Sequence, residues 1–201
     1  MQQRTPYFLN IFLLSLFILI ACGHKNNKQL HIQISTRKGD IELELYPDKA
    51  PRTVAAFLSF VDSGLFRNSS FYRVLKSEDQ PSSAFKTDLI QGGIWQTNNS
   101  KALSLRGIPH ENTQQTRLSH KNGVISLARI LPGTASSEFL ICLGDQPSYD
   151  YGGDANPDKQ GFAAFGKVIK GMEIVRLIHE QADFNGTLTP PIEIINIKRL
   201  K

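Results

Sequence analysis

The fold of this chain depends on the stretch Ser70-Phe71-Tyr72-Arg73-Val74-Leu75 and on the later run Leu89-Ile90-Gln91-Gly92-Gly93. Both segments have the short, apolar-rich pattern of β-strands. The segment between them, Lys76–Asp88, is rich in Ser, Asp and Lys, which indicates a polar loop. Arg73 and Gln91 are therefore expected on adjoining strands, flanked by aromatic side chains and backed by two glycines. This arrangement suggests a groove for a neutral substrate with a few hydrogen-bond donors.

The residues before this stretch predict a hairpin and a helix. Leu30–Ser35 and Ile41–Leu45 alternate apolar and polar residues and are joined by a turn at Arg37–Asp40. A helix is expected next, because Pro51 suits a first helical turn and Gly64 suits the position after a last turn. Its apolar stripe has helical spacing and consists of Val54, Phe57, Leu58 and Val61.

The residues after the stretch predict four more strands and a second helix. Trp95–Asn122 reads as a long irregular segment, and a turn at Pro132-Gly133 separates the next two strands. The strands are predicted at Gly123–Ala128, Glu138–Leu143, Phe162–Ile169 and Ile192–Leu200, and the helix at Met172–Glu180.

The predicted fold is mainly β, a closed eight-stranded antiparallel β-barrel with two capping α-helices. The elements show no alternating βαβ rhythm, and closing a barrel removes exposed strand edges. Side chains fill the interior of a barrel with about eight strands. The functional site is therefore expected on the outer wall.

Composition argues against several classes of function. The 201 residues carry a formal net charge of +5, and the Lys and Arg residues are scattered, so no nucleic-acid partner is expected. No metal is expected, because the histidines lack metal-ligand spacing. These histidines are His24, His31, His110, His120 and His179. No cofactor is expected either.

The N-terminus predicts export and a lipid anchor. Arg4 precedes an apolar run, Tyr7–Ala21, which is too short to span a membrane but has the length of a signal-peptide core. Leu19-Ile20-Ala21-Cys22 resembles a bacterial lipobox. The expected organisation is a lipoprotein signal peptide at 1–21, lipidation of Cys22, a flexible lipid-anchored tether at 22–30 and a folded domain at 31–201.

This organisation places the protein in the bacterial cell envelope, lipid-anchored to a membrane and facing the periplasm or the cell surface. An uncleaved anchor helix, or a secretory signal cut elsewhere, is the alternative. Cys142 is the other cysteine of the chain and lies in an apolar run, Phe139–Leu143, so a buried and inert thiol is expected there. No internal disulfide is expected.

From about Ile34 to Leu200 the chain resembles the cyclophilin-type peptidyl-prolyl cis-trans isomerases. Each matching segment is a weak signal alone, but all occur in the family's order, and the resemblance implies the same closed barrel. The segments are Gly39–Leu45, Ala50–Phe57, Phe71–Val74, Ile90–Gly93, Gly123–Arg129, Ser136–Ile141 and Phe165–Val168.

The resemblance implies that the chain catalyses rotation of X-Pro bonds and assists the folding of exported proteins. The expected partners are proline-containing polypeptide clients, and the protein is expected to be a monomer. The resemblance makes Arg73 and Gln91 the catalytic residues. The residues expected to bind substrate are Tyr72, Phe85, Leu89, Leu127, Ala128, Glu138, Phe139, Leu140, Tyr149 and Phe162.

The chain departs from the family at several groove positions. Asp88 stands where the family has a phenylalanine, and Phe85 in the preceding loop is expected to fill that vacancy. Glu138 replaces a glutamine and could form an ion pair with Arg73. The other departures are Leu140, Ser148 and Phe162. These changes keep open an alternative function, a catalytically weak or inactive binding or chaperone module at the cell envelope.

Overall fold

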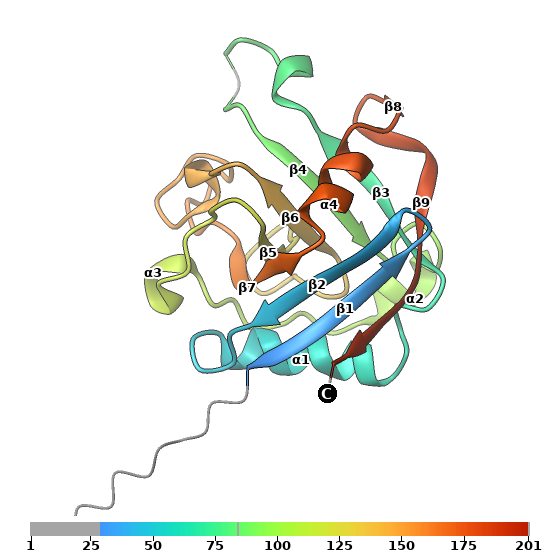
Figure 1. Cartoon of the computed structure of the whole chain (residues 1–201). Coiled ribbons are helices and arrows are strands. Elements are labelled where there is room, and N and C mark those ends of the chain that lie inside the picture. Colours follow the sequence, from blue (N-terminus) through green and yellow to red (C-terminus); the bar gives the residue numbers. More distant parts are fainter. Residues whose placement is uncertain (1–28, 84, 201) are drawn as a thin grey trace, which may run out of the picture.

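The computed structural model describes residues 29–83 and 85–200 (Figure 1). The predicted signal peptide, Cys22 and all but the end of the predicted tether lie outside these residues. Within the described ranges, no helix has both the length and the apolar character that crossing a bilayer requires.

Eight of the nine strands in the described residues close into an antiparallel barrel, as predicted (Figure 1). The order around the ring is β1, β2, β7, β5, β6, β4, β3 and β9, and β9 pairs with β1 to close it. The ring strands are β1 (Leu30–Thr36), β2 (Gly39–Leu45), β3 (Ser69–Leu75), β4 (Asp88–Gly93), β5 (Val124–Leu127), β6 (Phe139–Leu143), β7 (Ala163–Lys170) and β9 (Thr187–Arg199).

The last strand differs from its prediction. It begins at Thr187 rather than Ile192, and its first residues pair with β8 (Asp183–Phe184), a two-residue strand that the sequence did not predict. Pro190 and Pro191 lie where the pairing of β9 with β3 shifts register. Prolines are tolerated at such an irregularity because they have no N–H to donate.

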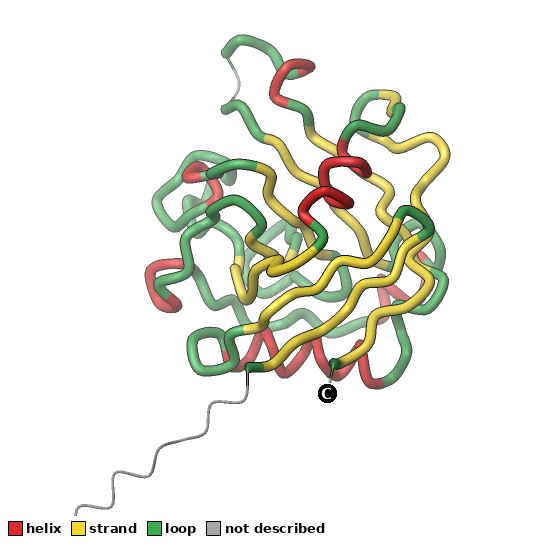
Figure 2. Tube along the Cα trace, viewed as in Figure 1, coloured by secondary structure: helices red, strands yellow, loops and turns green. Residues whose placement is uncertain are grey.

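The two longest helices match the predicted ones. They are α1 (Pro51–Asp62) and α4 (Met172–His179). Helix α1 contacts β7 and β9, and α4 contacts β2, β3, β4 and β6, so each helix reaches strands on different sides of the ring (Figure 2). The segment predicted as irregular contains two short helices, α2 (Asn99–Ser104) and α3 (Thr113–Thr116). Two single turns of 3-10 helix are η1 (Ser77–Asp79) and η2 (Pro147–Tyr149).

Phenylalanine rings fill the barrel interior. Phe139 is fully buried, and its ring lies edge-on to those of Phe57, Phe66 and Phe71, with ring centroids 5.7–5.8 Å apart. Edge-to-face contacts at this spacing are favourable for aromatic pairs. Leu127 is 1% exposed and belongs to the same core. Leu127 and Phe139 therefore pack inside the barrel and do not line an outer groove, which corrects the expectation for both.

Candidate active site

A groove of about 630 Å³ lies on the outer wall of the barrel, over β3, β4 and β6. Nine of the twelve residues predicted for the site line it. They are Tyr72, Arg73, Leu89, Gln91, Ala128, Glu138, Leu140, Tyr149 and Phe162. Strand alternation explains the two core exceptions, because Leu127 and Phe139 point inward while their neighbours Ala128, Glu138 and Leu140 face the groove.

Three polar side chains form a line across the groove. Arg73 is exposed, and its guanidinium donates to Oε1 of Gln91 at 3.3 Å. Nε2 of Gln91 donates to the hydroxyl of Tyr72 at 2.8 Å. Strands β3 and β4 pair Arg73 with Gln91 directly, which places the two side chains together. The prediction that these two residues lie on adjoining strands is confirmed.

Glu138, which directly precedes β6, completes this line. The Tyr72 hydroxyl donates to Oε2 of Glu138 at 2.8 Å, and the backbone N–H groups of Ile94 and Trp95 donate to Oε1, each at 3.0 Å. Burial raises the pKa of the Glu138 carboxyl above its ordinary value of 4.5, and these hydrogen bonds oppose the rise. Burial, followed by the nearby Glu138 charge, also raises the pKa of Tyr72.

Glu138 does not form the expected ion pair with Arg73. Its oxygens accept from Tyr72, from Ser137 and from two backbone amides, and among the described residues no carboxylate lies within ion-pair distance of Arg73. The guanidinium is therefore exposed, and among the residues that the structure describes it hydrogen-bonds only to Gln91.

An apolar floor lies beside Arg73. The rings of Tyr149 and Phe162 stack with centroids 4.7 Å apart, and they pack with Leu89 and Leu140 as one cluster. Cys142 belongs to the same cluster and is fully buried, and burial raises the pKa of its thiol to about 12. A thiol with so high a pKa carries little thiolate at neutral pH, so Cys142 serves as a small apolar side chain.

Sequence reasoning missed Arg129, which stiffens one wall of the groove. Its guanidinium donates two hydrogen bonds to Asp158, each of 2.8 Å, and one to the carbonyl of Gly161. The hydrogen bonds from Arg129 lower the pKa of Asp158 to about 2. The guanidinium also lies 5.5 Å from the centre of the Phe162 ring. A bidentate pair of this kind fixes both partners.

The far arm of the groove is apolar and was also missed. It comprises Trp95, Leu103, Leu105 and Ile130. Trp95, Leu103 and Ile130 are 44%, 69% and 86% exposed. These residues come from the irregular segment and from the turn after β5, where no periodic pattern shows which way a side chain points.

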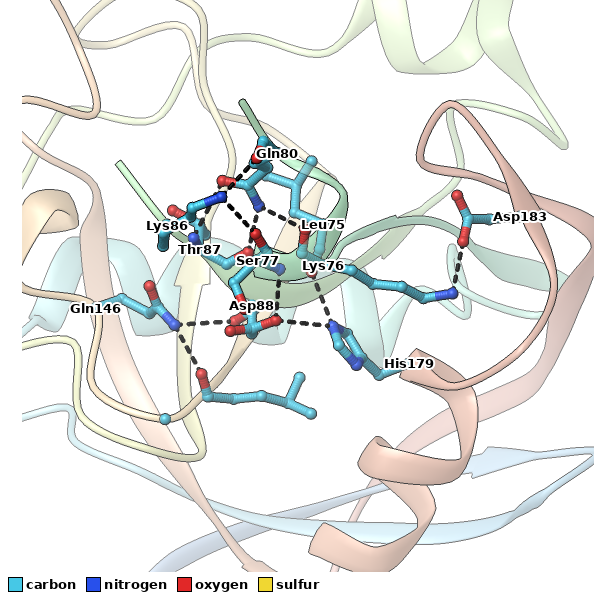
Figure 3. Close-up of polar contacts among 12 residues, drawn as sticks. Leu75, Lys76, Ser77, Gln80, Lys86, Thr87, Asp88, Gln146, His179 and Asp183 are labelled. Carbon is cyan, nitrogen blue, oxygen red and sulfur yellow. Dashed lines mark hydrogen bonds and ion pairs between the residues drawn. The ribbon is translucent and has the colours of Figure 1, made fainter. Parts of the chain in front are cut away.

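The inserted loop between β3 and β4 is fastened at its base (Figure 3). Oδ1 of Asp88 accepts from the backbone N–H of Ser77 at 2.8 Å and lies 3.6 Å from Nε2 of His179 on α4. Gln80 bonds to both the N–H and the carbonyl of Thr87, and Lys76 donates to Asp183 at 2.6 Å.

The loop projects away from the barrel (Figure 1). Asp88 turns toward His179 of α4 (Figure 3). None of the described residues between Lys76 and Lys86 lines the groove. Phe85 is 57% exposed and takes no part in the groove, so the expectation that it replaces the missing phenylalanine is wrong. Tyr149, Phe162, Leu89 and Leu140 form the apolar floor without it.

We expect Asp88→Ala to loosen this loop selectively. The substitution leaves the N–H of Ser77 without its acceptor, and a lost hydrogen bond of this kind makes local opening easier. The Ser77 amide should exchange with solvent about tenfold faster, measured by NMR hydrogen exchange. Asp88→Asn keeps an oxygen acceptor and serves as the control. Unchanged exchange at Ser77 in Asp88→Ala would contradict this role of Asp88.

A serine, a histidine and an aspartate are arranged like a hydrolase triad, but the serine is buried where no substrate can reach it. The ring of His120 lies 2.7 Å from Oδ1 of Asp150 and 2.7 Å from Oγ of Ser126. Ser126 is 0% exposed and His120 is 1% exposed. No substrate can reach the hydroxyl, so the network holds the loop after β6 in place. The described residues also contain no group of three His, Cys, Asp or Glu side chains that could hold a metal.

Comparisons with known proteins agree with this architecture. Residues 31–199 match the family model described as cyclophilin type peptidyl-prolyl cis-trans isomerase/CLD. The chain is 32% identical over 145 residues to a peptidyl-prolyl cis-trans isomerase of Acinetobacter baylyi, covering 72% of this chain and 69% of the relative. It is 32% identical over 151 residues to peptidyl-prolyl cis-trans isomerase A of Dickeya dadantii, covering 75% and 71%.

Solved structures share the barrel. A cyclophilin-type isomerase from Cryptosporidium parvum superposes with a TM-score of 0.67 at 21% identity, covering 86% of this chain and 98% of that one. The same protein, solved in the presence of the dipeptide Ala-Pro, gives a TM-score of 0.66 at 22% identity, covering 85% and 99%. From the family match, the curated relatives and the closed barrel, we conclude that the chain belongs to the cyclophilin-type peptidyl-prolyl cis-trans isomerases.

Proposed function

We propose that the groove around Arg73 is the place where this isomerase rotates X-Pro bonds of exported proteins. The observation that carries the proposal is the position of Arg73, exposed at the rim of an apolar floor, held by Gln91 and without an ion-pair partner among the described residues. A guanidinium in this setting keeps donors available for a substrate.

The chemistry requires only positioning and electrostatics. Rotation about a peptide C–N bond has a barrier of about 18–20 kcal/mol, because the bond has partial double-bond character. In the twisted state the prolyl nitrogen loses this resonance and regains a lone pair. A fixed donor beside that nitrogen stabilises the twisted state more than the planar one, which lowers the barrier.

In this proposal the apolar floor grips the proline ring. Tyr149, Phe162, Leu89 and Leu140 exclude water from the amide, and an apolar environment disfavours the charge-separated planar form. Arg73 supplies the donor to the prolyl nitrogen, and Gln91 holds the guanidinium. The exposed side chains of Trp95, Leu103 and Ile130 would contact the client on the other arm of the groove.

The alternative, a barrel that binds proline-containing segments without efficient catalysis, loses one of its arguments. It depended partly on an ion pair between Glu138 and Arg73, and Glu138 bonds to Tyr72 and backbone amides instead. The replacement of a family phenylalanine by Asp88 is also a weaker argument for lost catalysis than it was from the sequence. The stacked rings of Tyr149 and Phe162 supply aromatic side chains to the floor of the groove.

The test follows cis–trans exchange of Ala-Pro and Phe-Pro peptides by NMR with catalytic amounts of the purified protein. Uncatalysed exchange takes about 10–100 s, so acceleration is readily seen. We expect faster exchange with both peptides. A folded protein that broadens or shifts peptide resonances without accelerating exchange would establish the binding module instead.

We further propose that Cys22 carries the lipid and that the barrel works at the bacterial cell envelope, facing the periplasm or the cell surface. The support is the apolar run ending at Leu19-Ile20-Ala21-Cys22 and the polar residues that follow. Mass spectrometry of the membrane-extracted protein should find acyl chains on Cys22 and no residues before it. A chain that begins before Cys22, or an unmodified Cys22 thiol, would reject this anchor.

A further inference from the structure

The line of hydrogen bonds across the groove has two ends of fixed character. A guanidinium can only donate hydrogen bonds, and an ionised carboxylate can only accept them. Arg73 stands at one end and Glu138 at the other, with Gln91 and Tyr72 between them. Gln91 and Tyr72 can each donate or accept, so the direction of their hydrogen bonds is set by the groups at the two ends of the line.

We propose that Glu138 is a positioning residue that sets the direction of these hydrogen bonds and thereby holds the Arg73 guanidinium in place. The proposal rests on the proposed function, in which Arg73 acts on the prolyl bond. Glu138 does not touch Arg73. It acts through Tyr72 and Gln91.

The direction follows link by link from the carboxylate. Because Oε2 of Glu138 accepts, the Tyr72 hydroxyl must donate its one proton there. The hydroxyl oxygen is then free to accept from Nε2 of Gln91. That turns Oε1 of Gln91 toward Arg73, the orientation in which the guanidinium finds an acceptor.

The surroundings of Glu138 are built for an acceptor. Its other oxygen receives the N–H groups of Ile94 and Trp95 and the hydroxyl of Ser137, at 3.0 Å each. Gly93 leaves room for the carboxylate, since a Cβ at that position would lie 2.4 Å from Oε2. A carboxylate with donors on both oxygens cannot turn without losing hydrogen bonds.

A glutamine at position 138 cannot satisfy both sides. If its carbonyl faces Tyr72, its NH₂ group meets the N–H groups of Ile94 and Trp95, donor against donor. If its NH₂ group faces Tyr72, the hydroxyl proton turns to Gln91, whose amide then presents NH₂ to Arg73. The first arrangement loses the backbone amides that hold the side chain at position 138, and the second breaks the link from Gln91 to Arg73. Protonation of Glu138 at Oε2 has the same effect as the second arrangement.

The charged and titratable groups around Glu138 are few within the described residues. Strand β3 contributes Tyr72 directly and Arg73 through Gln91, and the Ile94–Trp95 segment contributes only backbone amides. Arg129, the other arginine of the groove, is engaged by Asp158. Burial of Glu138 raises its pKa above 4.5, so the switch in direction is expected above pH 4.5.

The experiment is an NMR pH titration of the side-chain NH₂ group of Gln91 and the Nε–H group of Arg73 in the purified protein. We expect both resonances to shift with the same midpoint as the Glu138 carboxyl, above pH 4.5. Tyr72→Phe removes the middle link and should abolish both shifts while the carboxyl still titrates. Resonances of Gln91 and Arg73 that stay fixed while Glu138 titrates would overturn the proposal.

Activity is the second readout. Glu138→Gln should lower kcat/KM for peptide exchange about tenfold at pH 7, which corresponds to the loss of one hydrogen bond to a charged group. Wild-type activity is expected to fall at acidic pH as Glu138 is protonated, and this fall should be absent in Glu138→Gln. Glu193→Gln is the matched control, because it removes an exposed carboxylate paired with Arg37. Wild-type kinetics in Glu138→Gln, with the same acid limb, would also overturn the proposal. Absence of catalysis in the wild type, with the NMR shifts as expected, would reject the proposed function and leave the role of Glu138 standing.

Discussion

Arg73→Ala is expected to lower kcat/KM for X-Pro exchange by about 100-fold to 1000-fold, the loss seen when one preorganised donor is removed from a transition state. The loss should fall mainly on kcat, because in the proposed function the guanidinium interacts with the prolyl nitrogen most strongly in the twisted state. Exchange NMR at several peptide concentrations separates kcat from KM.

Arg73→Lys and Arg37→Ala make this experiment specific. Lysine keeps the positive charge but not the planar fork of donors, so Arg73→Lys should recover only part of the activity. Arg37 is an exposed arginine that is paired with Glu193 and does not line the groove, so its loss should leave exchange unchanged. An Arg73→Ala protein with at least half of the wild-type kcat/KM would exclude Arg73 as the donor.

Phe139→Ala is expected to lower the free energy of unfolding by about 3–5 kcal/mol, measured by urea denaturation. The ring is fully buried against three other phenylalanines, and the barrel cannot collapse around the space it leaves. For a domain of ordinary stability this is a large part of the total.

Phe85→Ala is the matched control for the same chemical change. Phe85 is 57% exposed on the inserted loop, and its loss should change stability by less than about 0.5 kcal/mol and leave KM unchanged. A small effect of Phe139→Ala on stability together with a large effect on KM would show that Phe139 lines the groove and is not a core residue.

The strands and the two main helices could be predicted because their patterns are local. The alternation in β1 and β2 and the apolar stripe of α1 reflect one buried face each, and Ile32, Ile34, Ile41 and Leu43 are fully buried as that pattern requires. The pairing of Arg73 with Gln91 followed from two adjacent strands and one loop. Leu127 and Phe139 were expected in the groove only because of the family resemblance, and the alternation of strand residues places both in the core instead.

The contacts that complete the site could not be predicted, because they join residues far apart in the sequence. Tyr72 and Glu138 are 66 residues apart, and Arg129 and Asp158 are 29 apart. No spacing rule covers such pairs. The apolar arm of Trp95, Leu103 and Ile130 comes from non-periodic segments. No pattern in those segments shows that these side chains face the groove.

Trp95, finally, is the one tryptophan of the whole sequence, and it is 44% exposed in the wall of the groove. Its backbone N–H also donates to Glu138. Indole fluorescence from this protein therefore arises at the groove and nowhere else. A client that occupies the groove will change the polarity around that indole, so binding can be followed by emission spectra of the unlabelled protein, independently of catalysis.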